Sequence, residues 1–281
     1  AVANLILDPV FIFVFGLGIR GAAIATVLSQ ILSATFVLYF LRKKTELTVR
    51  LLSLEEIRGC WNRAKNIISL GTAGFIMQLT NSLVTICCNN VLSVTGGDLY
   101  ISVMTIVSSI RQIIDTPIHA ITEGSSPVIS YNYGARRPKR VFQSWLTMSV
   151  MAILYTLLAW GVILFAPRFL IGIFSSDQTL ITDAIPALKL YFGAFVFQAL
   201  QYVGQTMFKS LGKKKFAIFF SLLRKVIIVV PLTYILPYLF HMGSDGVFLA
   251  EPVSNVLGGS ACFIVMLCTV MPELKRMAKE K

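Results

Sequence analysis

Apolar residues run along this chain in eight long segments, separated by short connections that are polar or contain glycine. An α-helix needs about 20 apolar residues to cross the ~30 Å hydrocarbon layer of a membrane, and most of the segments reach that length. We therefore predict an all-α, polytopic membrane protein with about eight transmembrane helices. The predicted segments are 1–17, 20–41, 64–93, 98–122, 141–166, 184–208, 216–240 and 246–270.

The composition points the same way, because 56% of the residues are hydrophobic and only 14% are charged. A soluble domain carries roughly 25% charged residues. The net charge is +12, and most Lys and Arg residues lie in four connections, 42–65, 136–140, 209–215 and 275–281. Basic connections that alternate with nearly uncharged ones follow the positive-inside rule. We predict a multi-pass plasma-membrane protein whose basic connections and C-terminus lie in the cytoplasm, and no nucleic-acid binding.

Two segments far apart in the chain carry small residues at matching places. Gly21, Ala25 and Ser29 pair with Gly246, Ala250 and Ser254, each 225 positions later. Small residues let helix backbones approach closely in a membrane. The two segments are the second and the eighth predicted helix, an offset of six helices, so a parallel six-helix repeat is indicated, although chance similarity remains an alternative. Two such repeats predict a two-lobed, twelve-helix transporter, of which this chain is expected to be the C-terminal part.

The polar connector at residues 42–63 divides the predicted helices into two groups. Ser53 and Glu56 have the spacing of a capping box, and apolar residues recur at helical spacing after them. This predicts an amphipathic helix on the cytoplasmic membrane surface, either a hinge or a plain surface helix. The predicted domains are residues 1–41, the last two helices of the N-terminal lobe; 42–63, the connector; 64–271, the six-helix C-terminal lobe; and 272–281, a basic cytoplasmic tail.

The segment at 98–122 holds ionisable residues that are costly inside a membrane. Arg111, Asp115, His119 and Glu123 follow one another at four-residue spacing, so they share one helix face. Arg111 and Asp115 are placed to form an ion pair, and Pro117 removes a backbone hydrogen bond nearby. The stripe is predicted to face a central cavity and to handle protons or substrate; an ion pair that only fixes helix packing is the alternative.

Further candidates for a substrate or ion pathway lie on other segments. Asp8 and Glu251 each precede a proline, so they either bind an ion or cap a helix break. Arg224 and Lys225 are expected to lie close to the cytoplasmic boundary and to extend toward it. Amide side chains that either line the cavity or link helices by hydrogen bonds are Gln78, Asn81, Gln201 and Gln205.

The chain lacks the motifs of the enzyme classes considered. There is no Gly-x-x-x-x-Gly-Lys-Ser/Thr for ATP, no His-Glu-x-x-His, no Ser/His dyad and no pair of catalytic aspartates. The five cysteines show no metal or redox spacing. We therefore expect no catalytic residues, no metal site and no cofactor other than a coupling ion.

Three stretches resemble the multidrug and toxic compound extrusion (MATE) family, and the likeness covers nearly the whole chain. They are NLILDPVFIFVFGLGIRGAAIATVLSQ from Asn4, EGSSPVISYNYGARRPKRV from Glu123, and GVFLAEPVSN from Gly246. The resemblance implies helices five to twelve of a two-lobed antiporter that exports small cationic or amphiphilic compounds in exchange for protons or sodium ions. Its partners would be these substrates, the lipid bilayer and the missing N-terminal lobe.

Two departures from the family pattern leave the coupling ion open. The segments that correspond to the seventh and tenth helices have no acid at mid-span, and the last repeat motif ends in Ser254-Asn255 rather than Ser-Asp. The alternative function is a lipid-linked oligosaccharide flippase of a related two-lobed type. A flippase is expected to have a strongly cationic cavity, whereas the sequence suggests few cations at mid-membrane.

Overall fold

A computed structural model of the chain describes residues 2–43 and 60–279. Every regular element in these two ranges is a helix, and none is a strand. The chain forms two units, Ala1–Lys65 and Asn66–Lys281, referred to below as unit 1 and unit 2. Most of the predicted connector, including its capping box at Ser53, lies outside the described residues.

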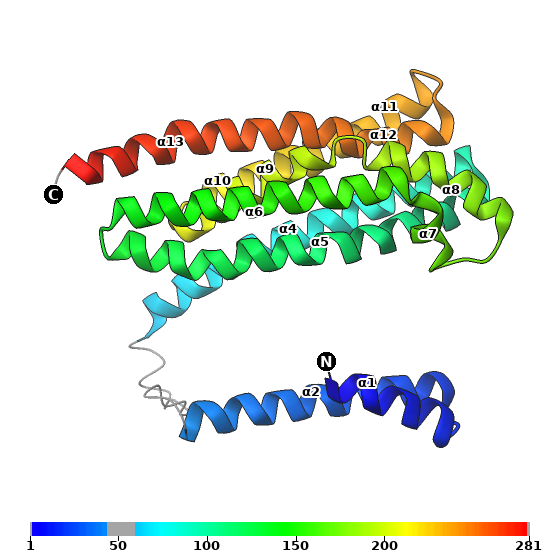
Figure 1. Cartoon of the computed structure of the whole chain (residues 1–281), viewed down its shortest axis with the longest axis horizontal. Coiled ribbons are helices and arrows are strands. Elements are labelled where there is room, and N and C mark those ends of the chain that lie inside the picture. Colours follow the sequence, from blue (N-terminus) through cyan, green and yellow to red (C-terminus); the bar gives the residue numbers. More distant parts are fainter. Residues whose placement is uncertain (1, 44–59, 280–281) are drawn as a thin grey trace. The chain divides into compact units, whose positions relative to one another are not determined.

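Unit 1 contains a helical hairpin (Figure 1). Helix α1 (Val2–Pro9) continues into a short π-helix, η1 (Val10–Val14), and a glycine-rich turn leads to α2 (Gly18–Lys43). Gly16 and Gly18 have positive φ angles, which glycine adopts without steric cost. The turn brings α2 back along α1.

Unit 2 contains long helices that run side by side for much of their length (Figure 1). Several runs are broken into shorter pieces by π-helical turns or by bends. The elements are α4 (Trp61–Thr95, which begins in unit 1), α5 (Gly97–Gly134), α6 (Pro138–Phe165), α7 (Pro167–Gly172), α8 (Gln178–Tyr191), α9 (Phe195–Ser210), α10 (Lys214–Leu222), η2 (Leu223–Val229), α11 (Val230–Tyr238), α12 (Gly243–Ser254), η3 (Asn255–Gly259) and α13 (Ser260–Lys279).

Helical runs occupy each of the eight predicted segments, so the all-α prediction is confirmed for the described residues. On length and composition, four of these runs are able to span a membrane, and a fifth is if α8 and α9, bent by 50°, form one span. They are Gly18–Lys43, Pro138–Phe165, Lys214–Tyr238 and Gly243–Lys279. The protein is a multi-pass membrane protein, and the number of eight crossings stays a prediction.

One predicted boundary is wrong. The segment at 98–122 is only part of α5, which continues to Gly134 and passes through Pro117 and Pro127 without a break. The helix ends where the backbone N–H of Arg137 donates to Asn132 and Arg136 takes a positive φ of 51°. Proline removes only one helical hydrogen bond, and neighbouring helices hold α5 on both sides of it.

The two repeat segments have the same local geometry within their own hairpins. Gly18 and Gly243 begin α2 and α12 with positive φ. Three residues later, a Cβ on Gly21 would lie 2.6 Å from the carbonyl oxygen of Phe11, and one on Gly246 would lie 2.8 Å from the backbone nitrogen of Pro237. Each glycine therefore allows its helix to press against the backbone of the preceding helix, as the repeat predicts.

Unit 2 has two apolar clusters with polar residues between them. One cluster gathers residues of α4, α5, α8 and α12, among them Ile114 and Ala250. The other gathers residues of α5, α6, α9, α10 and α13, among them Ile118 and Cys262. Asp115 comes directly after Ile114 of the first cluster on α5, and Glu251 comes directly after Ala250 of the same cluster on α12. Along α5 and α12, these two carboxylates therefore lie next to buried apolar residues.

The basic turns of unit 2 meet at one end. Glu273 of α13 accepts hydrogen bonds from the Tyr133 hydroxyl, at the end of α5, and from the Lys213 ammonium, in the turn between α9 and α10. The turn at Ala135–Arg137 and the turn at Leu211–Lys213 are therefore on the same side as the last turns of α13. This agrees with the predicted alternation of basic and nearly uncharged connections.

Candidate functional site

A cavity of about 290 Å³ opens between the helices of unit 2 at the level of the charged residues. Its walls come from α4, α5, α8, α9, α10 and η2. Six predicted site residues line it: Asn81, Arg111, Asp115, His119, Gln201 and Gln205. Three of the four stripe residues of α5 therefore line the same cavity as the amides of α4 and α9. This agrees with the first of the two interpretations, in which the stripe faces a cavity.

Asp115 is buried, and side chains of α5 and α9 bind its carboxylate. The Arg111 guanidinium pairs with it along the helix at 3.1 Å, which confirms the predicted ion pair. From α9, Gln198 donates to both carboxylate oxygens at 3.3 and 3.2 Å, and the Tyr202 hydroxyl donates at 3.2 Å. Three donor side chains hold this carboxylate, so its charge is compensated within unit 2.

Glu251, on α12, is the centre of a second group of charges. Its carboxylate lies 2.7 Å from Arg111, 3.4 Å from Arg224 and 3.1 Å from Lys225. Only 4% of its side chain is exposed, so all three ion pairs are sheltered from solvent. Arg111 joins the two groups because it contacts both Asp115 and Glu251.

Residues on π-helical turns supply much of this group. Arg224 and Lys225 lie on η2, and Asn255, whose amide oxygen accepts from Arg224, begins η3. A π-helical turn re-aims side chains relative to a regular α-helix and is frequent at functional sites. Gly258 makes the contact possible, because a Cβ there would lie 2.9 Å from Cγ of Arg224.

Aromatic side chains complete the cavity wall. The Tyr191 hydroxyl accepts from Arg111, and its ring lies under that guanidinium at 5.4 Å. His119 meets the edge of the Tyr202 ring at 4.6 Å between centroids. Gln201 donates to the carbonyl of Phe220 at 3.4 Å, while its own buried oxygen has no partner among the described residues.

Four predicted site residues do not line this cavity. Glu251 borders a neighbouring space of about 40 Å³ instead. Glu123 is exposed and pairs with Lys209 at 3.2 Å, so it does not share the environment of Arg111 and Asp115. Gln78 is exposed on α4. Asp8 belongs to unit 1, where Asn4 donates to it at 3.2 Å.

Sequence reasoning placed Arg224 and Lys225 wrongly. They do not extend to the cytoplasmic boundary; they are buried near the middle of the run Lys214–Tyr238 and bind Glu251. Together with Arg111, they also overturn the expectation of few cations at this depth. An Arg-Lys pair inside an apolar run is itself a signal, because an intramembrane charge requires a partner or a function.

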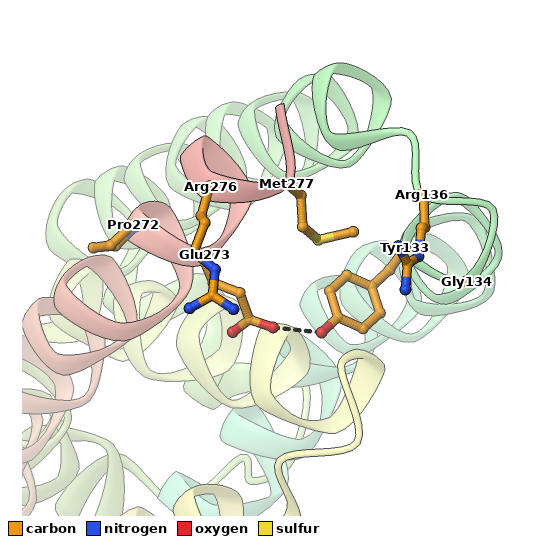
Figure 2. A pocket seen from close by; sticks show the side chains of 7 residues that line it. All are labelled: Tyr133, Gly134, Arg136, Pro272, Glu273, Arg276 and Met277. Carbon is orange, nitrogen blue, oxygen red and sulfur yellow. Dashed lines mark hydrogen bonds between the residues drawn. The ribbon is translucent and has the colours of Figure 1, made fainter. Parts of the chain in front are cut away.

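A larger space of about 770 Å³ lies at the basic end of unit 2, away from the buried charges. Figure 2 shows the Tyr133 hydroxyl hydrogen-bonded to Glu273 in its wall, with Arg136, Arg276 and Met277 around them. It opens between helix ends, and its central carboxylate is already bound by Tyr133 and Lys213. The smaller cavity is the stronger candidate because its walls hold buried ionisable groups from several helices.

Comparison with known proteins identifies the fold. The multidrug export protein MepA of Staphylococcus saprophyticus is 26% identical over 268 residues, which cover 94% of this chain and 57% of MepA. A MOP superfamily transporter from Pyrococcus furiosus has the same fold, with a TM-score of 0.85 at 24% identity over 98% of this chain and 61% of that one. An outward-facing multidrug resistance MATE transporter gives 0.83 at 24% identity, over 99% and 61%.

The chain thus spans little more than half the length of these proteins. The profile of the MatE family matches residues 74–235, which is more than half of the sequence and includes most of the residues that line the cavity. The sequence match and the shared helical fold lead to one conclusion: the chain belongs to the MATE family.

Proposed function

We propose that this chain is the C-terminal part of a cation-coupled antiporter that exports drugs or other toxic organic compounds by alternating access of two lobes. The observation that carries the proposal is the cavity of unit 2, where buried ionisable groups from α5, η2 and α12 meet beside open space. Buried charges in a membrane helix bundle are typical of substrate and ion pathways. Membership of a family with multidrug export proteins supplies the reaction class.

The expected substrates are small, amphiphilic or cationic compounds that enter a cavity shared with the missing N-terminal lobe. Rocking of one lobe against the other would open this cavity to each side of the membrane in turn. The proposed coupling ion is a proton or a sodium ion, and its candidate binding groups are the carboxylates Asp115, Glu251 and Asp8. No further cofactor is proposed.

The test measures drug accumulation in cells that express the protein from its complete gene, with proton and sodium gradients collapsed separately. Expression should lower accumulation of a fluorescent drug, and loss of one gradient should abolish the effect. Accumulation that does not depend on expression, or on either gradient, would contradict the proposal.

The part played by Asp115 is tested in the same cells. Asp115→Asn removes a charge that Arg111 contacts and should change both the efflux rate and its dependence on external pH. Thr116→Ser, at the next position but exposed, is the matched control and should leave both unchanged. Unaltered efflux and pH dependence in Asp115→Asn would leave the residue with a packing role only.

The alternative function, translocation of a lipid-linked oligosaccharide, gains support from the cations Arg111, Arg224 and Lys225. A pyrophosphate group needs such a cationic cavity. The two functions differ in cargo, so translocation of a pyrophosphate-linked lipid in proteoliposomes, measured beside drug efflux, separates them.

A further inference from the structure

The charges that face the cavity are unequal. Among the described residues that line it, Arg111, Arg224 and Lys225 are cationic and Asp115 alone is a carboxylate. His119, also in the wall, adds no negative charge in either protonation state. The wall is therefore more basic than acidic.

The acid in this wall is already bound by donors, which an organic cation would have to displace. Asp115 already accepts hydrogen bonds from Arg111, Gln198 and Tyr202. An ammonium group that entered the cavity would have to displace these donors and would meet three like charges. Such an arrangement opposes a cation in a low-dielectric space.

Glu251 does not reverse this balance at the cavity surface. It borders the neighbouring small space and is not among the residues that line the cavity. Its single charge also faces three cations at 2.7 to 3.4 Å. Counting both carboxylates, the group still carries an excess positive charge, and a buried excess charge is costly unless a counter-ion compensates it.

Donors are left over on the cavity side. Within the described part of the chain, the Lys225 ammonium, which has three N–H groups, contacts only the carboxylate of Glu251. Ser221, also buried, faces the cavity one turn before it. Ammonium, guanidinium and hydroxyl groups are the usual ligands of carboxylate, sulfonate and phosphate oxygens.

We infer that this cavity binds the anionic group of its ligand, between Lys225, Arg224 and Arg111. The inference rests on the proposed function, since it names the substrate class of the same cavity: amphiphiles with an anionic headgroup, rather than simple organic cations. A volume of about 290 Å³ accommodates such a headgroup with an attached ring.

The test compares three probes that share one ring system and differ in charge: naphthoate, naphthylmethanol and naphthylmethylammonium. Their affinities are measured by calorimetry on the protein made from its complete gene, in phosphatidylcholine nanodiscs. Naphthoate should bind about tenfold more tightly than naphthylmethylammonium, or better, since one charge at a few ångströms in a protein interior is worth at least that ratio.

Variants connect the affinity to the named side chains. Lys225→Gln and Arg224→Gln should each weaken naphthoate about tenfold and leave naphthylmethanol almost unchanged. Lys189→Gln removes a cation of α8 that does not line the cavity and should change neither affinity. Asp115→Asn removes the carboxylate of the wall and should tighten naphthoate, a gain that misfolding cannot produce.

The inference is overturned if naphthylmethylammonium binds as tightly as naphthoate, if no probe binds, or if Lys225→Gln and Arg224→Gln bind naphthoate like the unaltered protein. Export is tested separately in proteoliposomes. If naphthoate binds as expected but no substrate is exported under any gradient, the proposed function fails and the anion site stands.

The anionic group belongs either to a dissolved compound or to a membrane lipid, and a second series distinguishes these sources. Nanodiscs that contain phosphatidylglycerol should weaken naphthoate binding if the lipid headgroup occupies the same cations. Unchanged affinity assigns the site to a dissolved anion. Both results agree with an anion site.

Discussion

The Glu251 carboxylate is bound by three cations, Arg111, Arg224 and Lys225. It therefore contributes more to the stability of this group of charges than Asp115 does. Removing one member of a buried ion pair typically costs about 3–5 kcal/mol, because the partner stays buried without compensation. Loss of Glu251 leaves Arg224 and Lys225 without their carboxylate. Loss of Asp115 leaves Arg111 still bound to Glu251.

This asymmetry gives the first prediction. Glu251→Gln should lower the free energy of unfolding by about 3–5 kcal/mol, and Asp115→Asn by about 1–3 kcal/mol. Unfolding of the purified protein by heat or denaturant provides the measurement. The double variant Glu251→Gln with Lys225→Gln should recover part of the loss, since one uncompensated cation is gone. Equal losses for the two single variants, or no recovery, would contradict this account.

The second prediction concerns Asp177, the N-cap residue of α8. Its carboxylate accepts from the Thr179 hydroxyl at 2.7 Å and from the Thr179 backbone N–H at 2.9 Å, and these bonds, the hydroxyl first, lower the pKa of Asp177 from its ordinary value of 3.8. Because the folded-state pKa is the lower one, the stabilisation is present above the ordinary value and is lost as the pH falls through the lowered one.

Asp177→Ala should therefore speed amide exchange at Thr179 at about pH 6, whereas Asp177→Asn, which keeps an N-cap oxygen, should change it less. The difference between the unaltered protein and Asp177→Ala should shrink below the lowered pKa. Equal exchange rates in both proteins at about pH 6 would show that the cap does not hold the first turn.

How much of the site the sequence reveals depends on whether a contact lies within one helix. The pair of Arg111 with Asp115 is predictable because four residues along a helix bring two side chains together. The pairs of Glu251 with Arg224 and Lys225 cross between helices, and no spacing encodes that. The predicted positions of Arg224 and Lys225 were wrong for the same reason. The sequence of an apolar run shows how far a charged residue lies from the ends of the helix, but not which residues of other helices it contacts.

At the scale of elements, the spacing of apolar residues predicts where helices occur but not how they bend. The eight segments agree with helical runs, but the spacing of apolar residues does not mark η2 or η3. At η3 the packing between helices is close, since the stem of Arg224 lies where a side chain on Gly258 would be. Helix ends are similarly set by tertiary contacts, which is why α5 extends to Gly134.

The close approach of α12 to α11 gives the third prediction. Gly246→Ala would place a Cβ 2.8 Å from the backbone nitrogen of Pro237, so the helices must separate. Overpacking of this kind costs about 1–3 kcal/mol. Gly161→Ala is the control, because a Cβ in that part of α6 meets nothing within 4 Å. It should be neutral or stabilise by up to about 1 kcal/mol, since alanine is the better helix former.

Thermal unfolding of the two purified variants compares them directly. The same comparison at Gly21, where a Cβ would lie 2.6 Å from the Phe11 carbonyl oxygen, tests the repeat. If the two segments are equivalent, Gly21→Ala should also destabilise its hairpin. A destabilised Gly246→Ala beside an unaffected Gly21→Ala would indicate that their similarity has no common structural role.

At the scale of the whole molecule, the distribution of charge predicts how unit 2 is oriented in the membrane. Tyr133, Lys213 and Glu273 bring three basic regions to one end of the unit. From that end, α6 has 28 residues, or about 42 Å of helix, which is enough to reach the opposite side of a bilayer. The loop before α8 therefore lies at the other end.

This orientation is the fourth prediction. In the protein made from its complete gene, with every cysteine replaced, single cysteines at Arg137 and Lys214 should resist a membrane-impermeant thiol reagent added to intact cells and should react after the membrane is opened. A cysteine at Ser176, exposed between α7 and α8, should react from outside. Labelling of Arg137 and Lys214 sites in intact cells, with Ser176 protected, would reverse the orientation. Labelling of all three from one side would instead mean that α6 does not cross the membrane, because its two ends would then share a compartment.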